Sequence, residues 1–70
     1  METGMHRFNV PDMTCGHCAG RVEKAVKGVD PQAEISVDLA NKEVTIRTQA
    51  EGARLSDAIR SAGYDNRPLG

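Results

Sequence analysis

Apolar and polar residues alternate along three stretches of this chain, and such a two-residue period is typical of β-strands. Residues 6–10 form the first stretch. Residues 33–47 alternate on both sides of a short turn, in which we expect Asn41 to take a positive φ. We also predict a weak final strand over residues 64–69, which do not alternate. Pro68 confines it to the edge of a sheet, because proline has no backbone N–H to donate.

Two other segments carry apolar residues at the three- and four-residue spacing of a helix. The first covers residues 17–27, with Gly28 as its expected stop and Pro31 as a barrier to continuation. The second covers residues 51–62, with Gly63 as its C-terminal cap. The apolar faces consist of Val22, Ala25, Val26 and Val29 in the first helix, and of Leu55, Ala58, Ile59 and Ala62 in the second.

The predicted order of elements is β-α-β-β-α-β, and this order limits the topology. Right-handed crossovers and one hairpin pack it as a four-stranded antiparallel sheet with both helices on one face. We therefore predict the α+β class and the ferredoxin-like, or split βαβ, fold. One domain covers residues 6–69, and residues 1–5 form a short polar lead before it.

The composition excludes several kinds of partner. The 70 residues carry a formal net charge of −1, which is too small to draw the chain to nucleic acid or to an anionic membrane. No apolar run approaches the ~20 residues that span a bilayer, so we expect no membrane insertion. We also find no signal peptide. This predicts a cytoplasmic location, where thiols stay reduced.

Cys15 and Cys18, the two cysteines of the chain, are its strongest chemical signal. They lie where the first strand gives way to the first helix. The unpaired N–H groups and partial positive charge of a helix N-terminus favour a thiolate, which is the form that binds metals and attacks disulfides. Because only two residues separate the cysteines, both sulfurs can converge on one ion. Such a pair indicates metal binding or redox exchange.

Two thiolates make a soft site with few ligands. Structural zinc sites need four ligands, whereas Cu(I) prefers sulfur and accepts two or three. A two-sulfur Cu(I) site is open to a third sulfur from another protein, so it suits transfer of the ion better than storage. No group of acids, bases or nucleophiles accompanies the pair, and we therefore expect no enzymatic activity.

The motif Met13-Thr14-Cys15-x-x-Cys18 precedes an amphipathic helix, and Ala62-Gly63-Tyr64 precedes the last strand. In these features the chain resembles the heavy-metal-associated domain family. It looks most like the small bacterial cytosolic copper chaperones, which are similar to the N-terminal metal-binding domains of copper-transporting P-type ATPases. The resemblance implies that Cys15 and Cys18 bind Cu(I) and pass it by ligand exchange to the metal-binding domain of such an ATPase.

Residues around the cysteines have supporting roles in this interpretation. The family implies that Met13 packs beneath the metal loop, and that Tyr64 fills the core or donates a hydrogen bond to a cysteine sulfur. His17 is a solvated residue, or it tunes the basicity of the thiolates, or it reaches a metal shared with a second molecule. In the last case, a protein that is monomeric without metal can form a metal-bridged dimer. Arg21 and Lys24 lie on the exposed side of the first helix and can steer docking to an acidic partner.

Other interpretations stay open from the sequence. The same cysteine pair suits a thiol-disulfide oxidoreductase, and two thiolates also suit a carrier of another soft metal, such as mercury, or of zinc. The chain can also be a metal-binding domain cut from a copper-transporting ATPase.

Overall fold

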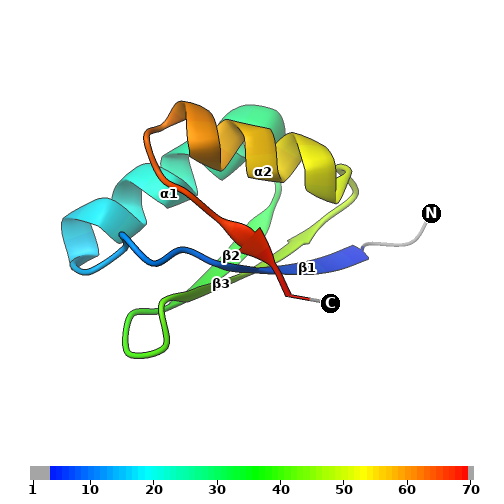
Figure 1. Cartoon of the computed structure of the whole chain (residues 1–70). Helices are drawn as coiled ribbons and strands as arrows, with labels where there is room; N and C mark the ends of the chain where they lie inside the picture. Colours follow the sequence, from blue (N-terminus) through cyan, green and yellow to red (C-terminus); the bar gives the residue numbers. More distant parts are fainter. Residues whose placement is uncertain (1–3, 70) are drawn as a thin grey trace.

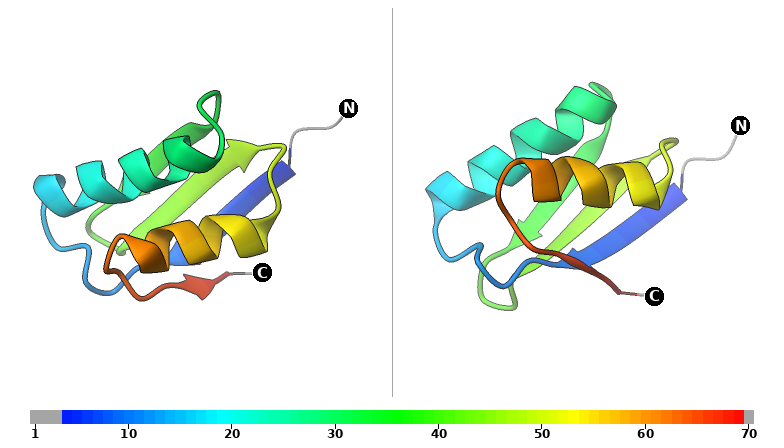
Figure 2. Two further views of the ribbon diagram at one scale, coloured as in Figure 1. Left: turned by 90° about the horizontal axis from the view of Figure 1, so that it is seen from above. Right: turned by 45° about the horizontal axis from the view of Figure 1, so that its top comes forward.

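A four-stranded sheet with the order β2-β3-β1-β4 forms one layer of the molecule, and all of its neighbouring strands are antiparallel. Both helices cover the same face of this sheet (Figures 1 and 2). The structure is a computed structural model and describes residues 4–69. It confirms the predicted ferredoxin-like fold. The elements are β1 (Gly4–Asn9), α1 (Gly16–Val29), β2 (Glu34–Asp38), β3 (Glu43–Thr48), α2 (Gly52–Ser61) and β4 (Arg67–Pro68).

β1 begins two residues earlier than the alternation predicts. Gly4 pairs with Thr48 and Met5 pairs with Arg47, so these two residues of the expected lead extend the central strand. The pattern does not show this extension, because the Met5 side chain is exposed although it is apolar. Backbone pairing with β3 therefore decides where the strand begins.

The expected end of the first helix at Gly28 is wrong. Gly28 lies inside α1, and the cap is Asp30, whose backbone is extended with φ −141° and ψ 103°. Pro31 follows directly, and a residue that precedes proline is forced out of the helical conformation by a clash with the proline ring. The helix ends because of Pro31, and Gly28 keeps a helical conformation.

The turn between β2 and β3 also differs in detail from the prediction. Lys42 has the positive φ of 56°, rather than Asn41. The Asn41 backbone N–H and side-chain amide instead donate to the Asp38 carboxylate, at 3.2 and 2.8 Å. Asp38 thereby fixes the first half of the turn and leaves the left-handed position to the next residue.

No helix within residues 4–69 is long and apolar enough to cross a bilayer. The hydrophobic core lies between the sheet and the two helices. With one Phe, one Tyr and no Trp in the chain, branched aliphatic side chains provide most of the buried apolar surface. The buried apolar residues are Phe8, Val10, Met13, Val22, Val26, Ala33, Val44, Ile46, Leu55, Ile59 and Tyr64.

Gly63 ends α2, as predicted, and it turns the chain toward β4. Its φ is +98°, a left-handed conformation that side chains with a Cβ rarely adopt. The Gly63 N–H donates to the carbonyl of Arg60 at 2.9 Å, and the Tyr64 N–H donates to that of Ile59 at 3.2 Å. These two bonds form a Schellman motif, which places Tyr64 immediately after the helix in a fixed position.

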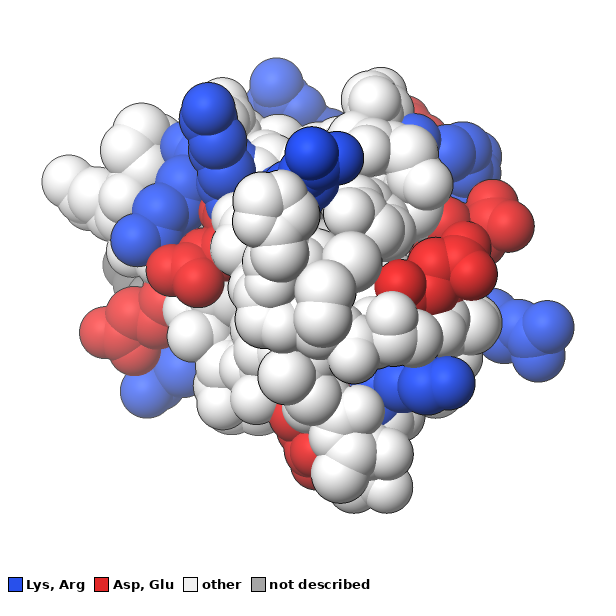
Figure 3. Space-filling view, turned by 90° about the vertical axis from the view of Figure 1, so that its left-hand side faces the viewer, with Lys and Arg blue, Asp and Glu red and all other residues white. Residues whose placement is uncertain are grey.

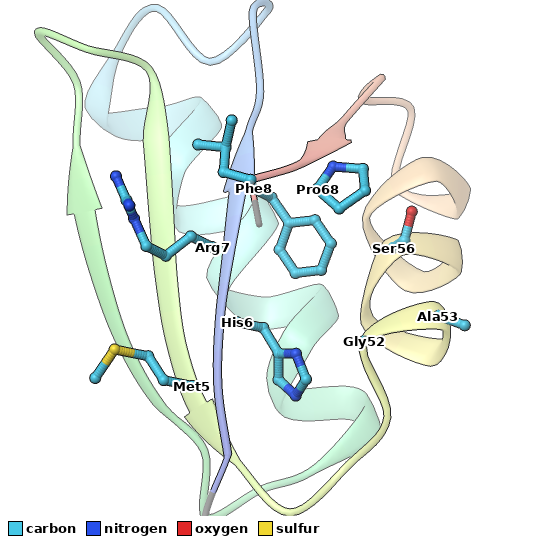
Figure 4. A pocket seen from close by; sticks show the side chains of 9 residues that line it. Met5, His6, Arg7, Phe8, Gly52, Ala53, Ser56 and Pro68 are labelled. Carbon is cyan, nitrogen blue, oxygen red and sulfur yellow. The ribbon is translucent and has the colours of Figure 1, made fainter.

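A groove of about 380 Å³ lies between β1 and α2, beside the short β4 strand (Figure 4). His6 and Phe8 extend toward α2 from β1, whereas Met5 and Arg7 extend to the other side of the strand. Neither Cys15 nor Cys18 lines this groove. The groove and the cysteine loop are therefore separate features of the molecule.

Candidate metal centre

The loop between β1 and α1 is anchored to the core before it reaches the cysteines. The Val10 N–H donates to the carbonyl of Lys42 at 2.8 Å, and the Met13 N–H donates to the carbonyl of Val10 at 3.0 Å. The Met13 side chain is completely buried. Met13 therefore packs beneath the loop and fixes it from below, while Thr14 and Cys15 that follow are exposed.

Cys15 is the N-cap residue of α1, and Cys18 lies in its first turn. The Cys15 backbone is extended, with φ −148° and ψ 166°, and its carbonyl accepts the first helical bond from the Ala19 N–H at 3.1 Å. No side chain caps this end of the helix, and no acidic residue lies in its first turn. The free N–H groups of the first turn therefore give the two sulfurs a positive electrostatic environment.

The two thiols lie within contact of each other, with Cys15 Sγ donating to Cys18 Sγ at 3.3 Å. This hydrogen bond is the largest cause of the lowered pKa of Cys18, and a hydrogen bond from the Tyr64 phenol is the second. Partial burial of Cys18 opposes both effects. Cys15 is exposed and Cys18 is half-buried. One sulfur therefore faces solvent, and the other is backed by protein.

Tyr64 contacts Cys18 from the loop after α2. The Tyr64 side chain is only 9% exposed and belongs to the core cluster, against which Cys18 also packs. The hydrogen bond to Cys18 is the largest cause of the raised pKa of the Tyr64 phenol, whereas the positive charge of Arg21 acts to lower that pKa. Tyr64 is thus a core residue, and its hydrogen bond to a cysteine sulfur stays a prediction.

The ligand set around the thiols is small. Within residues 4–69, no group of three or more His, Cys, Asp and Glu side chains is placed to hold one metal ion. Two thiolates without a hard oxygen ligand fit a soft ion that accepts low coordination, and they do not complete the four-ligand shell of a structural zinc site. The open side of Cys15 leaves room for a further sulfur to approach.

Comparison with known proteins identifies the family to which the chain belongs. The heavy-metal-associated domain matches residues 7–65, which include the β1–α1 loop and both cysteines. The chain belongs to the heavy-metal-associated domain family. Such domains occur both as small separate proteins and as parts of large transporters among the relatives of this chain.

Three relatives of this heavy-metal-associated domain show that range. It is 40% identical over 65 residues to copper-transporting ATPase 1 of Rhizobium meliloti, covering 90% of this chain but only 8% of the ATPase. It is 35% identical over 61 residues to the copper chaperone CopZ of Staphylococcus aureus, covering 83% of this chain and 90% of CopZ. A solved structure of the copper chaperone Atx1 from Synechocystis PCC6803, a His61Tyr mutant, superposes with a TM-score of 0.85. The two are 43% identical, covering 87% of this chain and 97% of Atx1.

The other predicted residues lie on the surface of this heavy-metal-associated domain. His17 is exposed in the first turn of α1, and Arg21 and Lys24 are exposed in the next turns. Lys27 forms an ion pair with Glu23 at 3.5 Å, whereas neither Arg21 nor Lys24 forms an ion pair within residues 4–69. Figure 3 views the end of the molecule at which α1 begins, and Lys and Arg side chains lie above an uncharged centre there.

Two polar residues near the site escape prediction from the sequence. The Ser56 hydroxyl of α2 donates to Asn66 Oδ1 at 2.5 Å, and Asn66 Nδ2 donates to the Ser56 carbonyl at 3.0 Å. Asn66 lies two residues after Tyr64. Nothing in the sequence indicates this contact. Ser56 and Asn66 lie in different segments of the chain, and both are uncharged residues outside any motif.

Proposed function

We propose that this heavy-metal-associated domain carries Cu(I) on Cys15 and Cys18 and hands it to a partner protein. One observation carries the proposal. The two thiol sulfurs lie 3.3 Å apart at the open N-terminus of α1, and residues 4–69 hold no group that would complete a larger shell. A soft d¹⁰ ion with two sulfur ligands suits this arrangement.

The relatives support copper as the cargo. The names of CopZ and Atx1 describe them as copper chaperones, and these proteins match this chain at 35% and 43% identity over most of its length. A chaperone role requires the ion to be bound and also to be accessible. The exposed Cys15 and the half-buried Cys18 meet both requirements, because one sulfur can yield to an incoming ligand while the other still holds the ion.

The transfer step follows from the chemistry of the two thiolates. A thiolate of the acceptor forms a new Cu–S bond to the ion, and the Cu–S bond to one cysteine of this chain then breaks. The released sulfur takes up a proton from solvent, and the oxidation state of copper does not change. The acceptor we propose is a metal-binding domain of a copper-transporting P-type ATPase, since a part of such an ATPase matches 90% of this chain.

The surroundings of the thiols suit this role. Arg21 and Lys24 are exposed and form no ion pair within residues 4–69, and their positive charge would attract an acidic acceptor surface. The exposed His17 would meet a second molecule over the ion. We propose a cytoplasmic protein that is monomeric without metal, that can form a metal-bridged dimer when loaded, and that has no catalytic residues of its own.

Anaerobic titration with Cu(I) in competition with a chromogenic chelator tests the proposal. We expect one tightly bound ion per chain, and no tight binding by Cys15→Ser or Cys18→Ser, because a single thiolate cannot close a two-ligand site. The far-UV circular dichroism of both variants should match the parent. Reduction of insulin disulfides by a wild-type protein that fails to hold Cu(I) would instead identify the pair as a redox centre.

A further inference from the structure

The loop that carries Tyr64 is fixed at both ends to α2. At the first end, the Schellman motif holds Gly63 and Tyr64 through bonds to the carbonyls of Arg60 and Ile59. At the second end, Asn66 makes two hydrogen bonds to Ser56, one to the side chain at 2.5 Å and one to the backbone at 3.0 Å. Tyr64 therefore lies at the first fixed point and Asp65 lies between the two, and the chain there has little freedom to shift.

The Ser56–Asn66 contact joins the end of this loop to the middle of α2. Ser56 lies on the second turn of α2, beside Pro68 of β4 and away from the metal loop (Figure 4). Ser56 and Asn66 are each partly exposed, and neither belongs to the core cluster. The main effect of their hydrogen bonds is therefore to position the loop, and they add little to the burial of apolar surface.

The position of this loop decides what Cys18 touches. Tyr64 belongs to the core cluster, against which Cys18 packs. The lowered pKa of Cys18, of which the Tyr64 phenol is the second cause, agrees with this contact. A contact between a phenol and a sulfur depends steeply on distance and angle, so a small shift of the loop is enough to weaken it. Any residue that fixes the loop therefore also fixes the environment of one sulfur.

We propose that Asn66, through its two hydrogen bonds to Ser56, is a positioning residue of the metal site that holds the Tyr64 phenol against Cys18. This inference rests on the proposed function, because it assigns Asn66 to the control of copper release. The phenol shields the protein side of Cys18 and helps to stabilise the negative charge of its thiolate. Loss of the contact opens a second route by which a competing ligand reaches the ion.

The test measures Tyr64 and the metal separately. Tyr64 is the only tyrosine and the chain has no tryptophan, so intrinsic fluorescence reports this side chain alone. In Asn66→Ala we expect brighter emission from the apo protein, because the phenol leaves the quenching sulfur. We also expect extraction of Cu(I) by a chelator to be about tenfold faster, the factor typical of one hydrogen bond to a charged group. Ser56→Ala, which keeps the backbone acceptor, should give a smaller change in the same direction.

A double-mutant cycle separates positioning from a general loss of stability. Tyr64→Phe removes the phenol hydroxyl, so adding Asn66→Ala to it should leave the extraction rate unchanged. Gln32→Ala serves as the control, since it removes an exposed amide beside Asp30, beyond the C-terminal end of α1 and away from the cysteines, and it should alter neither readout. Faster extraction on adding Asn66→Ala to Tyr64→Phe, or an unchanged Tyr64 emission in Asn66→Ala, would overturn the proposal. If the wild type binds no copper, the proposed function fails, while the apo emission still decides whether Asn66 positions Tyr64.

Discussion

The Thr48 hydroxyl donates to the Asp30 carboxylate at 2.5 Å and thereby joins the end of β3 to the end of α1. Thr48 is the buried polar residue of the core, with 2% of its surface exposed, and its hydroxyl also accepts the Ala50 N–H at 3.1 Å. Asp30 caps α1 and accepts the Gln32 N–H at 3.0 Å. One hydroxyl thus connects the three segments that meet at the end of the molecule away from the cysteines.

The hydrogen bond between Thr48 and Asp30 makes the stability of the fold depend on pH. The Thr48 hydroxyl first, and the Gln32 N–H second, lower the pKa of Asp30 below its ordinary value. The folded state therefore favours the carboxylate. Its stabilising effect is complete above the pKa of the unfolded chain and is lost as the pH falls through the lower pKa of the folded protein.

We predict that Thr48→Val, which keeps the shape and removes the hydroxyl, lowers the free energy of unfolding at pH 7. Because the protonated Asp30 gains less from the hydroxyl than the carboxylate does, the difference from the wild type should shrink in acid. Urea denaturation at pH 7, 5 and 3 measures this. An equal difference at all three pH values would mean that Thr48 acts only by packing.

Replacing Gly63 should lower the stability of the protein, whereas replacing Gly20 should not. With φ at +98°, alanine at this position has to adopt a left-handed conformation, which lowers the free energy of unfolding by about 1–2 kcal/mol. Gly20→Ala is the control, because Gly20 lies in the middle of α1 with open space around its missing side chain. That change should raise stability by ~0.5–1 kcal/mol. Thermal unfolding should show a melting temperature below that of the wild type for Gly63→Ala and above it for Gly20→Ala.

The burial of Met13 gives a prediction for the apo protein. Met13→Ala removes a completely buried side chain beneath the metal loop, and we expect a loss of about 2–5 kcal/mol in the free energy of unfolding. Met13→Leu, which nearly conserves the volume, should cost less than ~1.5 kcal/mol. Denaturant titration without metal measures both. A loss that appears only after copper is added would assign Met13 to the ion rather than to the core.

The sequence predicts this fold well because its elements obey simple periods. Ile35 and Val37 alternate with exposed residues in β2, and Leu55 and Ile59 lie one helical turn apart in α2. Where two local signals compete, the pattern fails. Gly28 suggests the end of a helix, but Pro31 decides it, and this outcome depends on the conformation of Asp30 between them.

Only the part of the candidate site that lies within the cysteine motif can be predicted from the residues themselves. Cys15 caps α1 and Cys18 lies in its first turn, so their convergence follows from local geometry. The contact of Tyr64 with Cys18 spans most of the chain, and only the resemblance to a family indicated it. The Ser56–Asn66 contact has no such help, since hydrogen bonds between uncharged side chains leave no periodic trace in a sequence.

Docking to an acceptor should depend on charges beside the metal loop. We predict that the double change Arg21→Glu and Lys24→Glu slows Cu(I) transfer about tenfold or more at low salt, because rim charges act mainly on the rate of association. The effect should fade as ionic strength rises, since salt screens exposed charges. Extraction of copper by a small chelator should not change, because neither side chain is a ligand.

A matched control separates docking from net charge in that experiment. The double change Arg47→Glu and Arg54→Glu alters the charge by the same amount, but Arg47 lies in β3 and Arg54 lies at the start of α2, away from the cysteines. Stopped-flow transfer to a metal-binding domain of a copper-transporting ATPase, at several acceptor concentrations and salt levels, should show little effect of the control. Equal slowing by both pairs would make the attraction a property of the whole molecule. A transfer rate that does not depend on acceptor concentration would show that copper leaves through solvent, and direct ligand exchange would then be wrong.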